Sequence, residues 1–566
     1  MKRYFCCILL ICIVFNLVEG FAGKELRERV YVQTDKQLYL AGEPVLMKLL
    51  TVDAGQIPLV FSKVVYVELA DDSIARLQTK IEMINGTGVG RMLLPTDLPT
   101  GYYRLIAYTQ FMRNEGTDVF FEKNIAIVNT FKSGYYPPET EVQPLPDINN
   151  VTQPETISLQ PDKATYTTRA SGKLTVTGLP ENIHTLSVSI AGKELLPIIE
   201  SDVSLFLKNR TRKTVADRRA EFLPEYEGHI ITGKIINNQT GEIGMDDLLL
   251  APGIAFPAGG GIRFFAGQTD KTGDVRFFTS GISGTKEIAT VVYNAGEKYR
   301  VDIQSPFVRR FTPAPMPALH IDSAYYGRLL ARSVALQVFR YFSENQSPSL
   351  NISESYFKMR PVWSYPLDEY TRFTTMREVF IEFIVGARFR RNADKHELLV
   401  LTKRGGDYDY GTMPLVLLDG VPISDHEAVY NYDPISVERI NIYYGPCMMG
   451  GYLFDGIVEL LTYSRFHADL NLNKSMQILT YEGPQSSHRL DAPDHSDMKN
   501  HQSRLPDRRH TLLWNPDVQV DGKTSIRLPF DTSDLTGEFQ ATVEGITKDG
   551  EIIYATSFFT VERLLY

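Results

Sequence analysis

The sequence predicts a mainly β fold, built of tandem β-sandwiches together with one α+β domain. Tyrosine and phenylalanine each occur 30 times, and both residues favour strands. A spaced motif, Q-x-D-K-x-x-Y, occurs twice, with a strand pattern on each side of it. Its two copies are Gln33, Asp35, Lys36 and Tyr39, and then Gln160, Asp162, Lys163 and Tyr166. Such a repeat indicates a duplicated sandwich domain.

A second repeat supports this interpretation. The stretches DLPTGYYRLIAYTQ (97–110) and DLTGEFQATVEGIT (534–547) both place a Thr-Gly turn before an alternating strand. Glycine supplies a backbone conformation that other residues resist, and the alternation buries one face of the strand. The last domain is therefore expected to be a sandwich of the same class as the first.

Length and composition limit the class of protein. A chain of 566 residues exceeds the usual growth of one hydrophobic core, so several domains are expected. Hydrophobic residues make up 43% and charged residues 22%, as in ordinary globular proteins. A formal net charge of −9 argues against nucleic acid as a partner, because phosphate binding requires clustered positive charge.

The first 22 residues have the pattern of a secretory signal peptide, 1–22. Lys2 and Arg3 precede an apolar stretch, and small residues follow it. The apolar stretch is shorter than the roughly 20 residues of a membrane-spanning helix, which disfavours an uncleaved anchor. Lipid attachment at Cys12 is a further alternative. Removal of the signal peptide would leave Cys447 as the remaining cysteine, with no internal disulfide.

Residues 23–132 resemble the MG2-type domains of the alpha-2-macroglobulin family. The resemblance rests on VYVQTDKQLYLAGEPV near the start and LPTGYYRLIAY near the end. It implies a β-sandwich. Residues 150–226, which carry the second copy of the motif, are expected to form a second, partial macroglobulin-like sandwich. Residues 466–566 are expected to form a loop and a separate C-terminal sandwich.

Residues 227–307 resemble carboxypeptidase-regulatory-like domains, which are small sandwiches. The turn Asp270-Lys271-Thr272-Gly273-Asp274 before a strand carries this resemblance. The region 308–364 is expected to be a helical linker, because apolar residues from Ser323 to Phe342 recur at spacings near three and four.

Residues 365–465 resemble the plug domains of TonB-dependent receptors. The motifs lie at Leu418–Ile423, Asp433–Pro446 and Gly456–Tyr463, in that order. A helix capped by Thr374-Thr375, short apolar strands, and a tight turn at Asp419-Gly420 are predicted here. We call residues 365–465 the plug-like domain.

The residues that follow the plug-like domain are not expected to form a receptor barrel. Such a barrel needs about 22 strands of about 9 to 11 residues, whereas 101 residues remain from Phe466 onward. The order of the four domain types resembles a group of exported proteins from Bacteroidota. That resemblance implies an architecture more than a function.

Several side chains are candidates for chemistry, and each also has a structural explanation. Cys447 lies in GPCMMGG without the nearby glutamine of a thioester segment, so a plain thiol is expected. His488, His495, His501 and His510 share a stretch with Asp491, Asp494 and Asp497, but their spacings match no compact zinc pattern. A solvated loop is favoured there over a metal site.

Two further parts of the sequence contain residue types that can carry chemistry. Asp419, Asp425, His426 and Glu427 form a possible acid–base group, although the turn at Asp419-Gly420 explains the first without chemistry. The glycine runs GVGRM and GGGIRF lack the strand-to-helix context of phosphate binding. The sequence therefore predicts no catalytic, cofactor-binding or metal-binding residues, and no cofactor. The tyrosine pairs Tyr102-Tyr103, Tyr135-Tyr136 and Tyr443-Tyr444 are candidate contact surfaces.

These observations favour a non-enzymatic, exported binding or scaffold protein of the Gram-negative envelope. It would act in the periplasm or against the outer membrane, and it would touch the membrane only through a partner. That partner is expected to be an envelope or outer-membrane protein. A cell-surface adhesin or fibre component of stacked sandwiches is the first alternative. A hydrolase using the His/Asp-rich stretch is the second.

Overall fold

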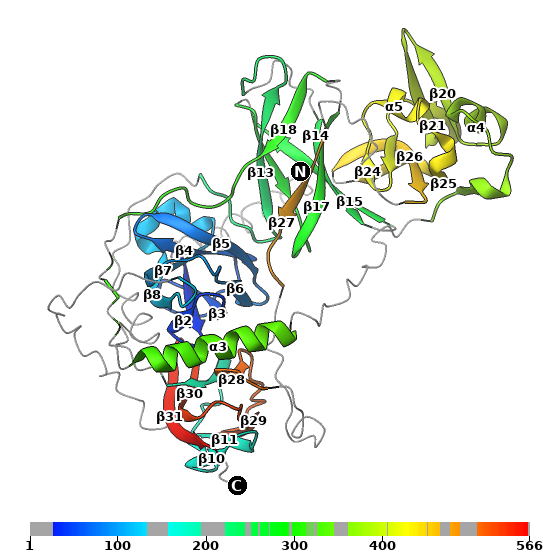
Figure 1. Cartoon of the computed structure of the whole chain (residues 1–566). Helices are drawn as coiled ribbons and strands as arrows, with labels where there is room; N and C mark the ends of the chain where they lie inside the picture. Colours follow the sequence, from blue (N-terminus) through cyan, green and yellow to red (C-terminus); the bar gives the residue numbers. More distant parts are fainter. Residues whose placement is uncertain are drawn as a thin grey trace, which may run out of the picture. The chain divides into compact units, whose positions relative to one another are not determined.

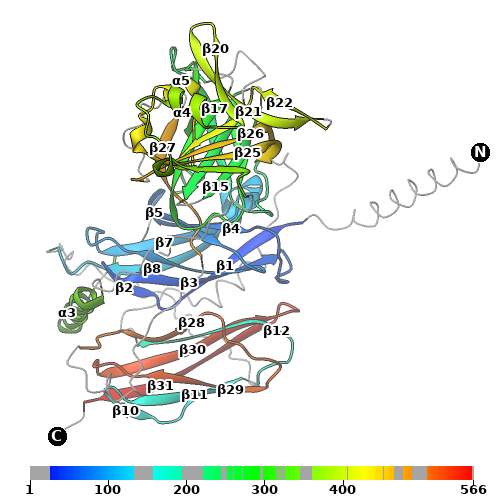
Figure 2. The ribbon, with the colours of Figure 1, turned by 90° about the vertical axis from the view of Figure 1, so that its right-hand side faces the viewer.

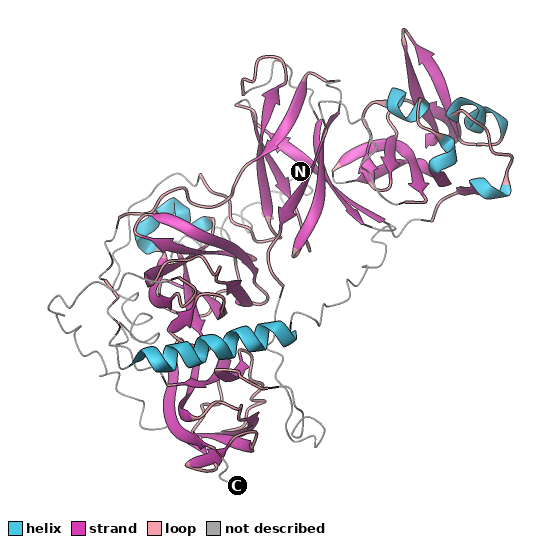
Figure 3. Ribbon diagram, viewed as in Figure 1, coloured by secondary structure: helices cyan, strands magenta, loops and turns pink. Residues whose placement is uncertain are grey.

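The computed structural model confirms a mainly β chain (Figure 3). It describes residues 26–132, 157–193, 221–243, 251–258, 261–270, 272–293, 297–313, 316, 318, 319, 321, 325–343, 360–404, 406–449, 451–464, 476–486 and 506–563. The predicted signal peptide lies outside these residues. None of the helices in the described part of the chain combines the length and apolar character that crossing a membrane requires.

The chain divides into two compact units (Figure 1). The first draws its described residues from Met1–Tyr226, Arg309–Gln346 and Gln485–Tyr566. The second draws them from Glu227–Val308 and Ser347–Pro484. Each unit is therefore assembled from segments that are far apart in the sequence.

The first sandwich of the first unit has eight strands in two sheets. They are β1 (Glu28–Thr34), β2 (Leu38–Leu40), β3 (Pro44–Asp53), β4 (Val64–Asp71), β5 (Ile74–Glu82), β6 (Thr87–Leu93), β7 (Gly101–Tyr108) and β8 (Phe121–Val128), with short 3-10 helices η1 (Phe111–Glu115) and η2 (Thr117–Val119). The sheet orders are β1-β3-β6 and β2-β8-β7-β4-β5. Asn85 and Gly86 both have positive φ and form a tight turn between β5 and β6, closed by backbone hydrogen bonds between Ile84 and Thr87.

The second sandwich combines strands from both ends of the chain. They are β9 (Ser158–Pro161), β10 (Thr165–Thr167), β11 (Ser171–Thr177), β12 (Ile183–Gly192), β28 (Thr511–Asn515), β29 (Ser525–Asp531), β30 (Gly537–Thr547) and β31 (Ile552–Glu562). The sheet orders are β9-β11-β29 and β10-β31-β30-β12-β28. Strand for strand, these orders repeat those of the first sandwich.

This arrangement corrects the prediction of two separate sandwiches at 150–226 and 466–566. In Figure 2 the cyan strands β10 to β12 and the orange-red strands β28 to β31 form one domain. Val188 of β12 lies opposite both Val543 of β30 and Asn515 of β28. One core joins the two halves, with Leu186 and Val188 packed against Val543. Neither half can bury its apolar face alone, so neither is a domain by itself.

Compared with the first sandwich, the second sandwich has a long insertion between its fourth and fifth strands, β12 and β28. Gly192 ends β12 and Thr511 begins β28, and these strands are antiparallel neighbours. The backbone N–H of Gly192 donates to the carbonyl of His510 at 3.0 Å. The insertion therefore leaves and returns at one hairpin position, where extra chain is readily accommodated.

The helix predicted within 308–364 is α3 (Tyr326–Ser343), and it belongs to the first unit. Leu329 and Leu336 pack against Leu38 and other core residues of the first sandwich. The guanidinium of Arg332 forms a buried ion pair with Glu43, with nitrogen–oxygen distances of 2.8 and 3.0 Å. The helix is thus packed and charge-paired, which a free linker would not be.

The second unit contains a seven-stranded sheet. Its strands are β13 (Ile230–Asn237), β14 (Ala251–Ala258), β15 (Gly261–Thr269), β16 (Asp274–Phe278), β17 (Thr285–Tyr293), β18 (Tyr299–Ile303) and β27 (Gln477–Glu482), in the order β18-β13-β16-β15-β14-β17-β27. The predicted turn before β16 is confirmed, because the Asp270 carboxylate accepts hydrogen bonds from the backbone N–H groups of Thr272 and Asp274. Strand β27 lies within residues 466–566, which the sequence predicts to form a loop and a separate sandwich. Its pairing with β17 corrects this prediction.

The plug-like domain completes the second unit. Its elements are β19 (Trp363–Pro366), η4 (Leu367–Glu369), α4 (Met376–Glu382), β20 (Ala387–Asn392), β21 (Lys395–Arg404), β22 (Asp407–Gly411), β23 (Leu415–Leu418), β24 (Val421–Pro422), α5 (His426–Tyr430), η5 (Pro434–Ser436), β25 (Val437–Met449) and β26 (Tyr452–Thr462). Two local predictions are confirmed. Thr375 and Glu378 form a capping box on α4, and Asp419 and Gly420 make a positive-φ turn.

Candidate binding surfaces

Cys447 is a buried thiol of β25. Burial, and next the nearby Asp455 carboxylate, raise its pKa to about 11. A thiol with so high a pKa carries little thiolate at neutral pH, and thiolate is the reactive form. The structure places Cys447 as a free, buried thiol.

The histidine-rich stretch is only partly described. His488, His495 and His501 lie outside the described residues, whereas His510 lies beside β28 in the second sandwich. Within the described residues, no three His, Cys, Asp or Glu side chains are placed to hold a metal ion.

Asp419 and Asp425 of the possible acid–base group have structural roles. The Asp419 carboxylate accepts a hydrogen bond from the Thr462 backbone N–H at 2.7 Å and another from the Thr462 hydroxyl at 2.5 Å. It therefore joins the Asp419-Gly420 turn to β26. Asp425 caps α5 by accepting a hydrogen bond from the backbone N–H of Glu427.

His426 and Glu427 point to different partners. The Nδ1 atom of His426 accepts a hydrogen bond from the Leu398 backbone N–H at 3.1 Å, and burial lowers the pKa of this imidazole. Glu427 accepts from the backbone N–H of His396, which lowers the Glu427 pKa. The His396 ring stacks on the ring of Tyr430, with 3.6 Å between the ring centroids. The group thus fastens α5 to β21, and its members do not converge on a common point.

Three of the tyrosines considered as contact surfaces are core residues instead. The exposed fractions of Tyr102, Tyr103 and Tyr443 are 8%, 3% and 5%, so this part of the prediction is wrong. Tyr102 and Tyr103 are successive residues of β7 and therefore lie on opposite faces of its sheet. Both are buried because both faces are covered, and Tyr102 packs in the cluster that includes Leu38 and Leu319. Tyr135-Tyr136 lies outside the described residues.

Tyr444 belongs to a different surface, which the sequence did not reveal. Its ring lies edge-on to Trp363, with 4.7 Å between centroids, and 5.5 Å from the ring of Tyr408. The guanidinium of Arg388 covers the ring of Tyr410 at 3.9 Å, and Lys403 lies 5.7 Å from the ring of Tyr408. We call these six residues the aromatic strip: Trp363, Arg388, Lys403, Tyr408, Tyr410 and Tyr444.

The aromatic strip lies on β19, β20, β21, β22 and β25. Figure 2 labels the last four of these strands. Tyr408 is 54% exposed, and Arg388 and Lys403 are exposed as well. Cations above aromatic faces attract the rings, and Tyr, Trp and Arg are the side chains enriched in protein interfaces. The strip therefore has the composition of a binding surface.

Another face of the plug-like domain is covered within its own unit. Phe454 packs edge-on against Phe264 and Tyr293 of the seven-stranded sheet, with centroids 5.9 and 5.7 Å apart. The Tyr452 hydroxyl donates to the carbonyl of Pro252 at 3.0 Å. These residues share one apolar core, so the sheet and the plug-like domain form a single body.

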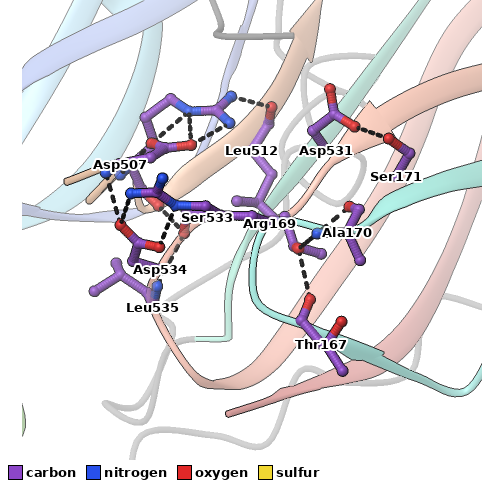
Figure 4. Close-up of polar contacts among 12 residues, drawn as sticks. Thr167, Arg169, Ala170, Ser171, Asp507, Leu512, Asp531, Ser533, Asp534 and Leu535 are labelled. Atoms are coloured by element: carbon purple, nitrogen blue, oxygen red, sulfur yellow. Dashed lines mark hydrogen bonds and ion pairs between the residues drawn. The ribbon is translucent and has the colours of Figure 1, made fainter. Parts of the chain in front are cut away.

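Polar contacts anchor the chain where it re-enters the second sandwich (Figure 4). Arg509 and Asp507 form a buried ion pair at 2.7 Å. Arg169 binds both oxygens of Asp534 at 2.7 and 2.8 Å, and Asp534 accepts from the Asp507 backbone N–H. The network connects residues of the two halves of the sandwich and therefore fixes the position of β28.

No protein-family model and no curated protein matches the chain. Among solved structures it is similar to Salmonella alpha-2-macroglobulin reacted with methylamine, at 9% identity and a TM-score of 0.24, over 95% of this chain and 39% of that chain. Escherichia coli alpha-2-macroglobulin activated by porcine elastase gives 10% identity and a TM-score of 0.25, over 95% and 44%.

The Escherichia coli adhesin FdeC gives 11% identity and a TM-score of 0.14, over 50% of this chain and 65% of that chain. The chain spans about two fifths of the length of the two macroglobulins. Similarities with such low TM-scores assign neither a family nor an activity to this protein.

Proposed function

We propose that this chain is a non-enzymatic, exported binding protein of the Gram-negative envelope. The second unit holds the partner through the aromatic strip, and the two sandwiches of the first unit form the scaffold that carries it. The partner is an envelope or outer-membrane protein, so that the chain meets the membrane only indirectly.

The aromatic strip is the observation that carries this proposal. Tyr408, Arg388 and Lys403 are exposed, and the half-buried rings of the strip lie beside them. Together they offer stacking, apolar contact and charge on one surface. The covered face of the plug-like domain supports docking at the strip, because a body already joined to a seven-stranded sheet offers only its open faces to a partner.

The test is site-specific photocrosslinking from position 410 in intact cells of the source organism, followed by identification of the captured protein. The double variant Tyr408→Ser, Arg388→Gln, with the crosslinker placed at Tyr410 in both backgrounds, is expected to lower capture at least tenfold, since a few aromatic and arginine residues carry most interface energy.

Tyr226→Ser is the matched control, because Tyr226 is exposed to a similar degree, 57%, and lies in the first unit. It should leave capture unchanged. Equal capture by the double variant, or capture of no envelope protein, would refute docking through the strip.

A surface adhesin is the second candidate, and the two sandwiches of identical strand order favour it, because such domains often space a binding surface away from a cell. Protease treatment of intact cells distinguishes the two. A periplasmic protein stays intact under this treatment, whereas a surface adhesin is cut.

A further inference from the structure

A cavity of about 180 Å³ lies between α3 and the second sandwich. Leu329 of α3 and Leu535 and Phe539 of the sandwich form much of its apolar wall. The side chains of Arg328 and His510 line the polar side of the cavity, and Gly192 also lines it. All these residues belong to the first unit.

Glycine keeps part of this space open. A Cβ atom at Gly192 would lie 2.4 Å from Nε2 of His510, well inside contact distance. The backbone of Gly192 is fixed there by its hydrogen bond to the His510 carbonyl. Any larger side chain at Gly192 would therefore have to displace the imidazole.

The charges around the cavity do not balance. Arg332 is neutralised by Glu43 at 2.8 Å, and Lys193 by Glu538 at 2.9 Å. Arg328, by contrast, makes no ion pair or hydrogen bond with any described residue. Its guanidinium lies beside Gly537, 3.8 Å from the position of a Cβ atom there. One positive charge at the cavity thus remains without a counter-charge among the described residues.

His510 adds an unused hydrogen-bonding group. Neither ring nitrogen has a hydrogen-bond partner among the described residues, and Nδ1 is buried. Burial, followed by the charges of Arg332, Lys36 and Arg328, holds the pKa of His510 well below its usual value. The imidazole is therefore neutral at neutral pH and can still donate one N–H. A polar group without a partner in such a place is uncommon in folded proteins.

We propose that this cavity binds a small monocarboxylate with an apolar body. The carboxylate pairs with Arg328 and accepts a hydrogen bond from His510, while the apolar body lies against Leu329, Leu535 and Phe539. The volume has room for on the order of ten non-hydrogen atoms. A guanidinium matches a carboxylate in both charge and geometry. This site is independent of the aromatic strip.

Titration calorimetry of the full chain with octanoate tests the proposal, with octanol and inorganic phosphate as probes of the two halves of the ligand. Octanoate should bind at least tenfold more tightly than octanol, which lacks the charge. Phosphate, which lacks the apolar body, should bind at least tenfold more weakly than octanoate.

Arg328→Gln should lower octanoate affinity at least tenfold, and Leu329→Trp should do the same by filling the cavity. Arg527→Gln is the control, because Arg527 is an exposed arginine elsewhere on the second sandwich. Circular dichroism confirms folding of each variant. Unchanged affinity in Arg328→Gln, equal binding of octanol, or absence of octanoate binding would each overturn the proposal.

Discussion

The repeated Q-x-D-K-x-x-Y motif forms the same corner in both sandwiches. The Tyr39 hydroxyl donates to the Asp35 carboxylate at 2.8 Å, and the Tyr166 hydroxyl donates to Asp162 at 2.6 Å. Each carboxylate also accepts the backbone N–H of the residue eleven positions later. The motif therefore fixes the crossing from one sheet to the other.

Removing the two tyrosine hydroxyls should have unequal effects. Asp35 is 4% exposed, whereas Asp162 is exposed. Water can therefore replace the lost tyrosine hydroxyl as a donor to Asp162, but it cannot reach Asp35. Tyr39→Phe should lower the free energy of unfolding by about 1–3 kcal/mol, and Tyr166→Phe by about 1 kcal/mol or less. Hydrogen exchange of β2 and β10 measures each locally. Equal losses at the two corners would contradict the role of burial.

Lys48 makes the stability of the first unit depend on pH. It is 5% exposed, and burial lowers its pKa to about 8, with Asp517 and Glu544 opposing the shift. The unfolded lysine has a pKa of about 10.4. Between these values the unfolded state binds more protons, so the free energy of unfolding should rise with pH from about 8 to about 10.4, by up to about 3 kcal/mol.

The measurement compares Lys48→Met with the natural chain, by hydrogen-exchange protection of β3, at several pH values in this window. The difference between the two proteins should shrink as the pH rises, because the natural lysine loses its buried charge. Tyrosines that titrate in the same range affect both proteins alike. A difference that stays constant with pH would show that Lys48 keeps its ordinary pKa.

At the level of elements, α3 depends on one buried ion pair. The side chains of Arg332 and Glu43 are 8% and 7% exposed, and Arg332 also donates to the Leu38 carbonyl at 3.0 Å. Burial alone would raise the pKa of Glu43, but the charges of Arg332 and Lys36 lower it by more than burial raises it. The carboxylate is therefore charged. The pair therefore ties the helix to the first sandwich.

Removing one partner should release the helix, and removing both should not. Arg332→Met leaves the Glu43 charge buried with less compensation and should destabilise this contact by about 3–5 kcal/mol. Arg332→Met combined with Glu43→Met should recover most of that loss, because an apolar pair of similar volume needs no compensation. Hydrogen exchange of α3 amides measures both. A double variant no better than the single one would contradict this account.

At the level of the whole molecule, the second sandwich is a host domain interrupted by an insertion. Ala191 of β12 lies opposite Thr511 of β28, so the ends of the insertion are already side by side. The network of Asp507, Arg509, Arg169 and Asp534 lies outside residues 194–505. The host should therefore fold without the insertion.

A shortened chain tests this directly. Residues 26–193 joined to residues 506–563 by a short Gly-Ser linker should form both sandwiches, with slow exchange of the amides of β12 and β28. Residues 26–193 alone should form the first sandwich only, because β9 to β12 then lack their partners. Rapid exchange of β12 in the joined chain would mean that the insertion is needed for folding.

The sequence by itself determined the local features of this protein. Alternation and turn residues placed several strands, the Thr375 cap placed α4, and the spacing of Asp35 and Tyr39 marked a corner that recurs at Asp162 and Tyr166. These features depend on residues close together in the chain, so their signals survive in a short window of sequence.

Only the tertiary structure decided which strands share a domain and which side chains gather. The pairing of Val188 with Val543, the joining of β27 to β17, and the grouping of Trp363, Arg388 and Tyr408 all bring distant residues together. Backbone hydrogen bonds between strands are the same whatever the intervening chain, and an apolar strand face fits many partners. The choice among those partners is made by the packing of the whole core, and no local pattern records it.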